Sequence, residues 1–130
     1  FYTGDITPPV GQPACHTDMD LDPIAWYCYQ GGKRTLPVGQ KLPNGWGLHD
    51  MLGNSWEWTQ SWFKGLGYGT DPLVDPEDPA MPFQWAVNLR GGNYFGDAAV
   101  CRASMKLELT QDARAPGGGF RLIRSVEPSR

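Results

Sequence analysis

The sequence has little that would suit it to nucleic acids or to a membrane. Its 11 lysine and arginine residues are scattered and its formal net charge is -3, so it has no basic stripe with which to neutralise phosphates. No apolar run approaches the roughly 18 to 20 residues of a membrane span. We therefore expect neither nucleic-acid binding nor membrane insertion by this segment.

Cysteine and histidine are also scarce. The three cysteines, Cys15, Cys28 and Cys101, cannot all pair within one chain. Cys15 and Cys28 are compatible with a disulfide that closes a loop of about a dozen residues, worth roughly 3 kcal/mol. Three buried thiols in a reducing compartment are equally compatible with the sequence. The only histidines, His16 and His49, are too few for a histidine cluster around a metal, and His49 suits a structural role.

Glycine, proline and aromatic residues are abundant instead. The chain has 17 Gly and 12 Pro together with 6 Trp, 5 Tyr and 5 Phe, and disordered chains rarely carry so many aromatics. This composition predicts a loop-rich fold in which aromatic side chains supply much of the buried area. The length of 130 residues suits one domain, which we place at residues 1–124, followed by a polar tail at 125–130.

Local patterns predict short strands and little helix. Leu48, Met51 and Leu52 suit one helical turn that ends at Gly53. The apolar run 24–29 is too short to distinguish a strand from a helical turn. Residues 64–86 form a long loop rich in Gly, Pro and Asp. Alternating or apolar stretches predict strands over residues 55–62, 87–92, 100–104 and 120–123.

Three motifs resemble one known family. Residues 43–58 read PNGWGLHDMLGNSWEW, which is similar to the formylglycine-generating-enzyme (sulfatase-modifying factor) signature Asn-x-x-Gly-Leu-x-Asp-Met-x-Gly-Asn-Val-Trp-Glu-Trp. Ser55 stands where valine is usual. Residues 89–94 resemble the family's Arg-Gly-Gly-Ser-Trp strand, and residues 119–122 resemble its closing Gly-Phe-Arg strand. The resemblance covers roughly residues 22–124.

The resemblance implies an α+β fold, the C-type-lectin-like fold of the formylglycine-generating-enzyme type. This fold has a small, twisted, mostly antiparallel sheet with few helices and long loops. The complete family domain is longer, and this chain resembles its C-terminal part. A missing N-terminal segment or another chain is therefore a candidate to complete it. Because the chain begins at Phe1 rather than methionine, an upstream signal peptide or lipid anchor is also compatible with it.

The family also implies two metals to consider. Asn54 and Glu57 match positions that supply oxygen ligands in calcium-binding members, and calcium prefers such ligands. The alternative is that both side chains only cap backbone groups in a tight turn. Enzymatic members hold copper with two cysteines, and thiolates suit Cu(I). This chain has Cys101 in the corresponding segment and Gly96 about where the second cysteine would fall, so we do not expect copper-dependent oxidation.

Residues 90–124 also resemble the variable region of proteins diversified by retroelements, in which fixed residues frame variable positions. The resemblance implies that the framed positions form a ligand-binding face. Phe95 and Met105 are candidate apolar anchors, as are Leu107 and Leu109, whose spacing also fits the inward face of a strand. Asp97 and Glu108 are candidate polar selectors. The candidate ligand-binding residues are Tyr94, Phe95, Gly96, Asp97, Ala99, Val100, Met105, Leu107, Glu108, Leu109, Ala115, Pro116 and Gly117.

These resemblances favour a non-catalytic module that binds a protein or glycan ligand. By resemblance it would be secreted or displayed on a bacterial cell surface. The alternative is a formylglycine-generating or related metal-dependent oxidase, or an accessory subunit of one. No nucleophile and base pair and no phosphate-binding glycine loop is evident in the sequence.

Overall fold

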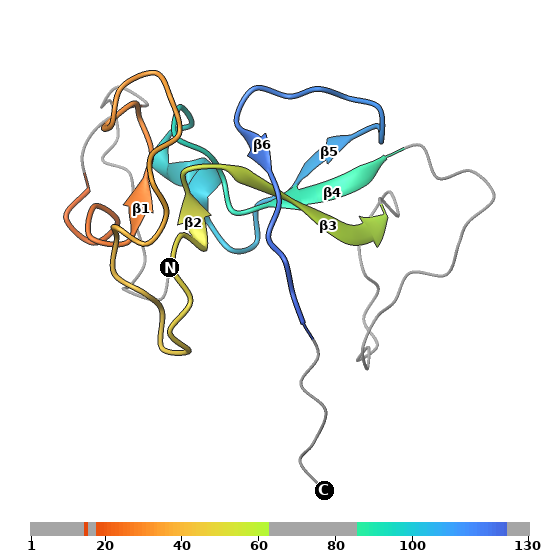
Figure 1. Ribbon diagram of the computed structural model, residues 1–130. Coiled ribbons are helices and arrows are strands. Elements are labelled where there is room, and N and C mark those ends of the chain that lie inside the picture. The colour runs from red at the N-terminus through yellow and green to blue at the C-terminus, as the bar shows by residue number, and fades with distance from the viewer. Residues whose placement is uncertain (1–14, 16–17, 63–85, 125–130) are drawn as a thin grey trace, which may run out of the picture.

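The computed structural model describes residues 15, 18–62 and 86–124 (Figure 1). Two small sheets organise it. Strands β1 (Ala25–Trp26) and β2 (Leu52–Gly53) pair in parallel. The larger sheet has the strand order β5-β4-β3-β6, and the described residues contain one short 3-10 helix, η1 (Ala98–Cys101), and no α-helix. This is the small sheet with long loops that the sequence predicts.

The larger sheet is mostly antiparallel. Its central strands are β3 (Trp56–Trp62) and β4 (Val87–Arg90), which pair in antiparallel fashion, with a register shift between Trp58 and Trp62. Strand β5 (Leu107–Leu109) pairs antiparallel with β4. Strand β6 (Gly118–Gly119) pairs parallel with β3, so β5 and β6 are the two edges of this sheet.

The structure confirms two predicted strands and corrects three other predictions. Residues 55–62 and 87–92 contain β3 and β4. The predicted helical turn at 48–52 is wrong, because Asp50 has a positive φ angle of 56° and Leu52 lies in β2. The predicted strand at 100–104 is wrong, because η1 occupies its start. The predicted strand at 120–123 is also wrong, because pairing with β3 ends at Gly119.

The buried core is small and lies mainly beside β1 and β2. Leu21, Ile24 and Tyr27 are at most 2 % exposed and pack with Leu52 and η1. The Tyr27 hydroxyl donates to Asp22 Oδ1 at 2.5 Å and accepts from the Asp18 amide at 2.7 Å. These two bonds tie Asp18 and Asp22 to the buried Tyr27. In the larger sheet, Trp56 and the β4 side chains supply the buried area.

The turn after β2 connects the two sheets. The Gly53 amide donates to the carbonyl of Gly91 at 2.6 Å, and the Asn54 amide donates to that of Trp26 at 2.7 Å. A Cβ on Gly53 would lie 2.3 Å from the Trp26 carbonyl oxygen. Glycine at this position therefore lets β1 and β2 approach closely.

Candidate functional site

The loop that follows β4 begins the predicted ligand-binding segment. Gly91 and Gly92 have φ angles of +97° and +80°, which turn the chain out of the sheet. The Asn93 side chain is 2 % exposed, and its Oδ1 accepts from the Gly96 amide at 2.8 Å. The Tyr94 amide donates to the Asn54 carbonyl at 3.0 Å. This main-chain hydrogen bond links the signature motif at residues 43–58 to the loop after β4.

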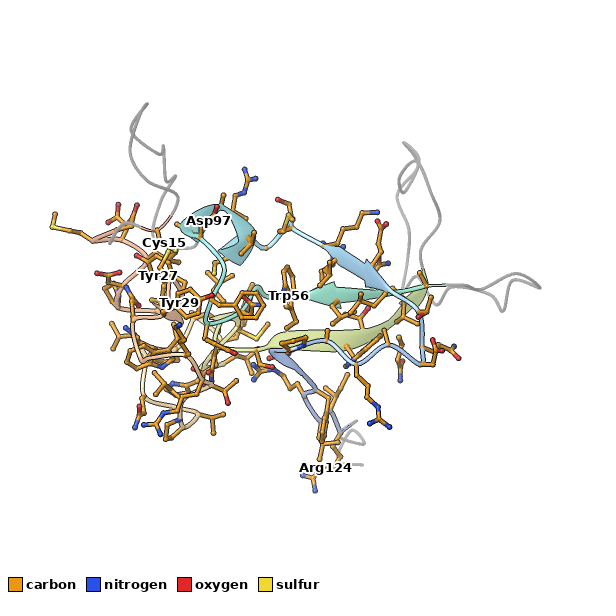
Figure 2. The ribbon with its side chains drawn as sticks, turned by 90° about the horizontal axis from the view of Figure 1, so that it is seen from above. Cys15, Tyr27, Tyr29, Trp56, Asp97 and Arg124 are labelled. Atoms are coloured by element: carbon orange, nitrogen blue, oxygen red, sulfur yellow. The ribbon has the colours of Figure 1, made fainter. Side chains whose placement is uncertain are left out.

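Tyr29 joins the predicted segment from a distant part of the sequence. Its amide donates to the Tyr94 carbonyl at 2.7 Å, and the Cys28 amide donates to the Gly96 carbonyl at 2.8 Å. The Tyr29 ring packs on Tyr94 and Phe95 with centroid distances of 6.3 and 6.4 Å, and the latter two rings meet edge to face at 5.1 Å. Tyr29 is 47 % exposed, and Figure 2 shows it beside the turn that carries Tyr27.

Gly117, at the end of the predicted segment, lies against one of these rings, that of Phe95. A Cβ on Gly117 would lie 3.1 Å from the Phe95 ring. The Gly117 carbonyl accepts from the Trp56 amide at 2.7 Å and from the Ser55 hydroxyl at 3.0 Å. Ser55, the residue that departs from the family signature, therefore holds this segment. We call the surface formed by Tyr29, Tyr94, Phe95 and residues 115–117 the aromatic face.

Asp97, Ala99 and Val100 lie in or beside η1 and contribute to the scaffold. Asp97 is the N-cap of η1, and its Oδ1 accepts from the Val100 amide at 3.2 Å, as capping residues do. Val100 packs against the core that contains Cys101. The Asp97 carboxylate, a candidate polar selector, therefore already accepts a hydrogen bond within the scaffold.

The remaining predicted residues lie at the other edge of the sheet. Leu107 is opposite Leu89 and Leu109 is opposite Val87 across the β4–β5 ladder. Directly opposed residues share one face of a sheet, and Leu89 and Val87 are buried. The inward-face alternative for Leu107 and Leu109 is therefore favoured. Glu108 is exposed and pairs with Lys106 at 3.2 Å, and Met105 is half-buried.

The predicted ligand-binding set therefore separates into three groups, and one of them, in or beside η1, holds Gly96, Asp97, Ala99 and Val100. Tyr94 and Phe95 belong with residues 115–117 to the aromatic face. Residues 105–109 lie on or beside β5, at the sheet edge opposite to β6. Sequence reasoning missed Tyr29, because its place depends on positive φ angles of 47° at Cys28 and 57° at Tyr29. The one sequence signal for Tyr29 was its position as an aromatic residue at the end of the apolar run 24–29.

Asn54 and Glu57, the predicted calcium ligands, are engaged with other groups. The Asn54 carboxamide accepts from the Leu36 amide at 2.9 Å and donates to the Leu36 carbonyl at 3.1 Å. The Glu57 carboxylate forms a two-pronged pair with Arg121, with Nε–Oε2 at 2.9 Å and Nη2–Oε1 at 2.5 Å. That pairing already balances the Glu57 charge. The two side chains as arranged do not fit a calcium ion, and they fit the alternative of fixing the turn.

The cysteines do not fit a two-thiolate copper site. A Cβ on Gly96, where the second cysteine would fall, would lie 2.3 Å from Val100 Cγ2. Cys101 is fully buried, and burial together with the nearby Asp97 carboxylate raises the pKa of its thiol to about 12. Cys15 and Cys28 are not joined by a disulfide in this structure. Burial and a hydrogen bond with Cys15 raise the pKa of Cys28 to about 12.

The exposure of Cys15 and the raised pKa values of the Cys28 and Cys101 thiols predict that alkylation will be selective. At pH 8 we expect iodoacetamide to modify the exposed Cys15 and to leave Cys28 and Cys101 unmodified, because only the thiolate reacts. Raising the pH towards 12 should make the partly exposed Cys28 react, whereas the fully buried Cys101 should react only when the chain unfolds. Peptide mass spectrometry measures each site, and unfolding the chain in guanidinium at pH 8 is the control in which all three react. Modification of folded Cys101 as rapid as that of Cys15 would contradict the prediction.

Comparisons with known proteins decide the family. The model of the sulfatase-modifying factor enzyme 1-like domain matches residues 11–126. The chain belongs to this family. The formylglycine-generating enzyme of Streptomyces coelicolor is 34% identical over 98% of this chain and 41% of its own length. The bovine formylglycine-generating enzyme is 29% identical over 99% of this chain and 34% of its own length. The chain thus spans less than half the length of these family relatives.

A solved structure extends the comparison. Treponema denticola variable protein 1 aligns with a TM-score of 0.63 and 29% identity, over 80% of this chain and 37% of that protein. Both resemblances seen in the sequence, to the sulfatase-modifying factor family and to variable proteins, are thereby confirmed. The expected C-type-lectin-like fold of the formylglycine-generating-enzyme type is confirmed with them. Within the described ranges, no helix of this family member is long and apolar enough to cross a bilayer.

Proposed function

We propose that this chain is a non-catalytic ligand-binding module whose binding surface is the aromatic face. The observation that carries the proposal is the joining of two distant segments by main-chain hydrogen bonds beneath a cluster of three partly exposed rings. The fold shared with a variable protein supports it. The ligand class is a protein or a glycan, because aromatic rings pack on either.

The mechanism is a rigid support beneath replaceable side chains. The amides of Cys28, Tyr29 and Tyr94 are all bonded to main-chain carbonyls, so the aromatic face is ordered before a ligand arrives. Pre-organisation of this kind lowers the ordering cost of binding. Aromatic side chains add large contact area at low conformational cost. Function carried by loops on a fixed scaffold is a general pattern.

A second candidate function is supported by the family relatives, which are formylglycine-generating enzymes. A titration with Cu(I) under anaerobic conditions discriminates the two. Binding near one copper per chain that is lost in Cys101→Ser would favour the oxidase. No uptake that depends on Cys101 would favour the binding module. The protonated, buried state of Cys101 supports the second outcome.

Sequencing codons 93–117 across the source population tests the proposed function. We expect substitutions at framed positions such as 95 and 115, traceable to adenines in a nearby template copy. Codons for Asn93 and Cys101, which are buried, should stay constant. The codons of the signature, 43–58, are the internal control. An invariant segment without a template copy would remove the diversified-binder hypothesis.

A further inference from the structure

A cleft of about 540 Å³ lies between the signature motif and the segment that follows β6. Its walls include residues 38–39, 47–50 and 119–121, and Figure 1 shows the chain after β6 leaving the sheet. None of these residues belongs to the aromatic face. The volume suits a small organic ligand, since small-molecule sites commonly measure about 300–1,000 Å³.

The lining of the cleft combines apolar side chains with a buried acid. Val38, Leu48 and Phe120 line the cleft and are exposed. Asp50 also lines it but is only 8% exposed. Small-molecule sites typically have this composition, in which apolar walls contact the body of the ligand and a few polar groups fix its orientation.

The Asp50 carboxylate has one oxygen engaged and one oxygen available. Its Oδ2 accepts from the Gly39 amide at 2.7 Å. Among the described residues no donor contacts Oδ1, and those residues do not seal this oxygen from solvent. Because Asp50 lines the cleft, Oδ1 is an acceptor that a ligand in the cleft can reach.

The charges of the cleft do not cancel. Arg121 forms a two-pronged pair with Glu57, and its Nη2 also donates to the main-chain carbonyls of His49 and Asp50. The hydrogen bonds to Glu57 raise the pKa of Arg121, and the charge of Asp50 adds to this rise. One guanidinium therefore faces two carboxylates. His49, the remaining titratable residue of the lining, is neutral in the formal charge count at pH 7, so one negative charge is left at Asp50.

The single available oxygen restricts the kind of cation that fits. A guanidinium presents a fork of donors that matches two carboxylate oxygens, whereas an ammonium acts as a point charge. A quaternary ammonium has no N–H to donate. Calcium takes six to eight oxygen ligands, and the described part of the chain has no group of three or more His, Cys, Asp or Glu side chains that could hold a metal ion.

We propose that the cleft binds a primary alkylammonium ion, whose –NH3⁺ group donates to Asp50 Oδ1 while its aliphatic chain packs on Leu48 and Phe120. The Phe120 ring adds a second attraction, since aromatic faces attract a cation within about 6 Å. The proposal goes beyond the proposed function, because it concerns a site that shares no residue with the aromatic face.

Titration of the ¹⁵N-labelled chain with n-butylammonium chloride at low ionic strength tests the proposal. We expect the amide signals of Gly39 and Phe120 to shift with a Kd on the order of 1–10 mM, as for a very small ligand. Butanol and butyrate carry the same chain without the positive charge and should bind at least about tenfold more weakly. Equal binding of butanol, or tighter binding of tetramethylammonium or calcium, would overturn the proposal.

Substitutions locate the site. Asp50→Asn removes the charge and keeps an acceptor for the Gly39 amide, and asparagine tolerates the positive φ of this position. It should weaken butylammonium binding at least about tenfold. Phe120→Leu, at an exposed position, should weaken it severalfold and decides the matter if Asp50→Asn does not fold. Asp112→Asn, an exposed acid outside the cleft, is the matched control, and an affinity that neither Asp50→Asn nor Phe120→Leu lowers would contradict the assignment.

A second probe distinguishes two sources of the ammonium group. Nα-acetyl-lysine N-methylamide carries the same group on a peptide unit. Binding at least as tight as that of butylammonium would indicate the lysine side chain of a protein, and weaker binding would indicate a free small amine. Both outcomes support an ammonium site, and the absence of shifts with either probe would refute it.

Discussion

Trp56→Ala is expected to lower the free energy of unfolding by about 3–5 kcal/mol, the usual cost of deleting a buried tryptophan side chain. Trp56 is 5% exposed and begins the longest strand, β3. Its main-chain bond to Gly117 does not depend on the side chain. The loss is therefore one of buried area and of packing. Urea denaturation, followed by far-ultraviolet circular dichroism, measures it.

Trp46→Ala is the matched control for this substitution. It changes the same residue type within the same sixteen-residue motif, but Trp46 is 87% exposed. We expect a change within about 0.5 kcal/mol, as for most surface substitutions. If Trp46→Ala were the more destabilising of the two, the burial described for the signature motif would be wrong.

Gly53→Ala is expected to destabilise the fold by more than about 2 kcal/mol. An alanine in the left-handed conformation costs roughly 1–2 kcal/mol, and Gly53 has a φ of +76°. Its new Cβ would also lie 2.3 Å from the Trp26 carbonyl oxygen. Strands β1 and β2 would have to separate to admit it. Thermal and urea unfolding of the purified variant measure the loss.

Gly39→Ala isolates the conformational part of that effect. Gly39 has the same φ of +76°, and a Cβ there meets nothing within 4 Å. This variant should show the conformational cost alone, about 1–2 kcal/mol. The difference between the two variants then reports the clash with β1. Equal losses would show that β1 and β2 do not approach as closely as described.

The sequence predicted features that depend on local alternation or on a long motif. Strands β3 and β4 follow from alternating and apolar residues, and the fold follows from the signature at 43–58. It did not predict β2, because the positive φ at Asp50 replaces the helical turn that Leu48 and Met51 suggest. It did not predict η1, because the Asp97 cap is a single side-chain bond without periodicity.

The candidate site was also predicted only in part, because some of its residues are placed by contacts that leave no local pattern. Tyr94, Phe95 and residues 115–117 were selected by resemblance, and the structure brings them together. Tyr29 was missed, because main-chain bonds between residues far apart in sequence leave no pattern. Leu107 and Leu109 had two interpretations that spacing alone did not separate. The pairing of β5 with buried β4 residues favours the inward one.

The main-chain bonds beneath the aromatic face have an evolutionary consequence. Amide and carbonyl groups are the same in almost every amino acid, so the bonds at residues 28, 29 and 94 survive replacement of the side chains above them. Such a surface tolerates mutation without losing its shape. Positions 96 and 117 are exceptions, because a Cβ there would lie 2.3 Å from Val100 Cγ2 and 3.1 Å from the Phe95 ring, respectively. A lineage that enlarges residue 96 must shrink residue 100, which links the histories of these two codons.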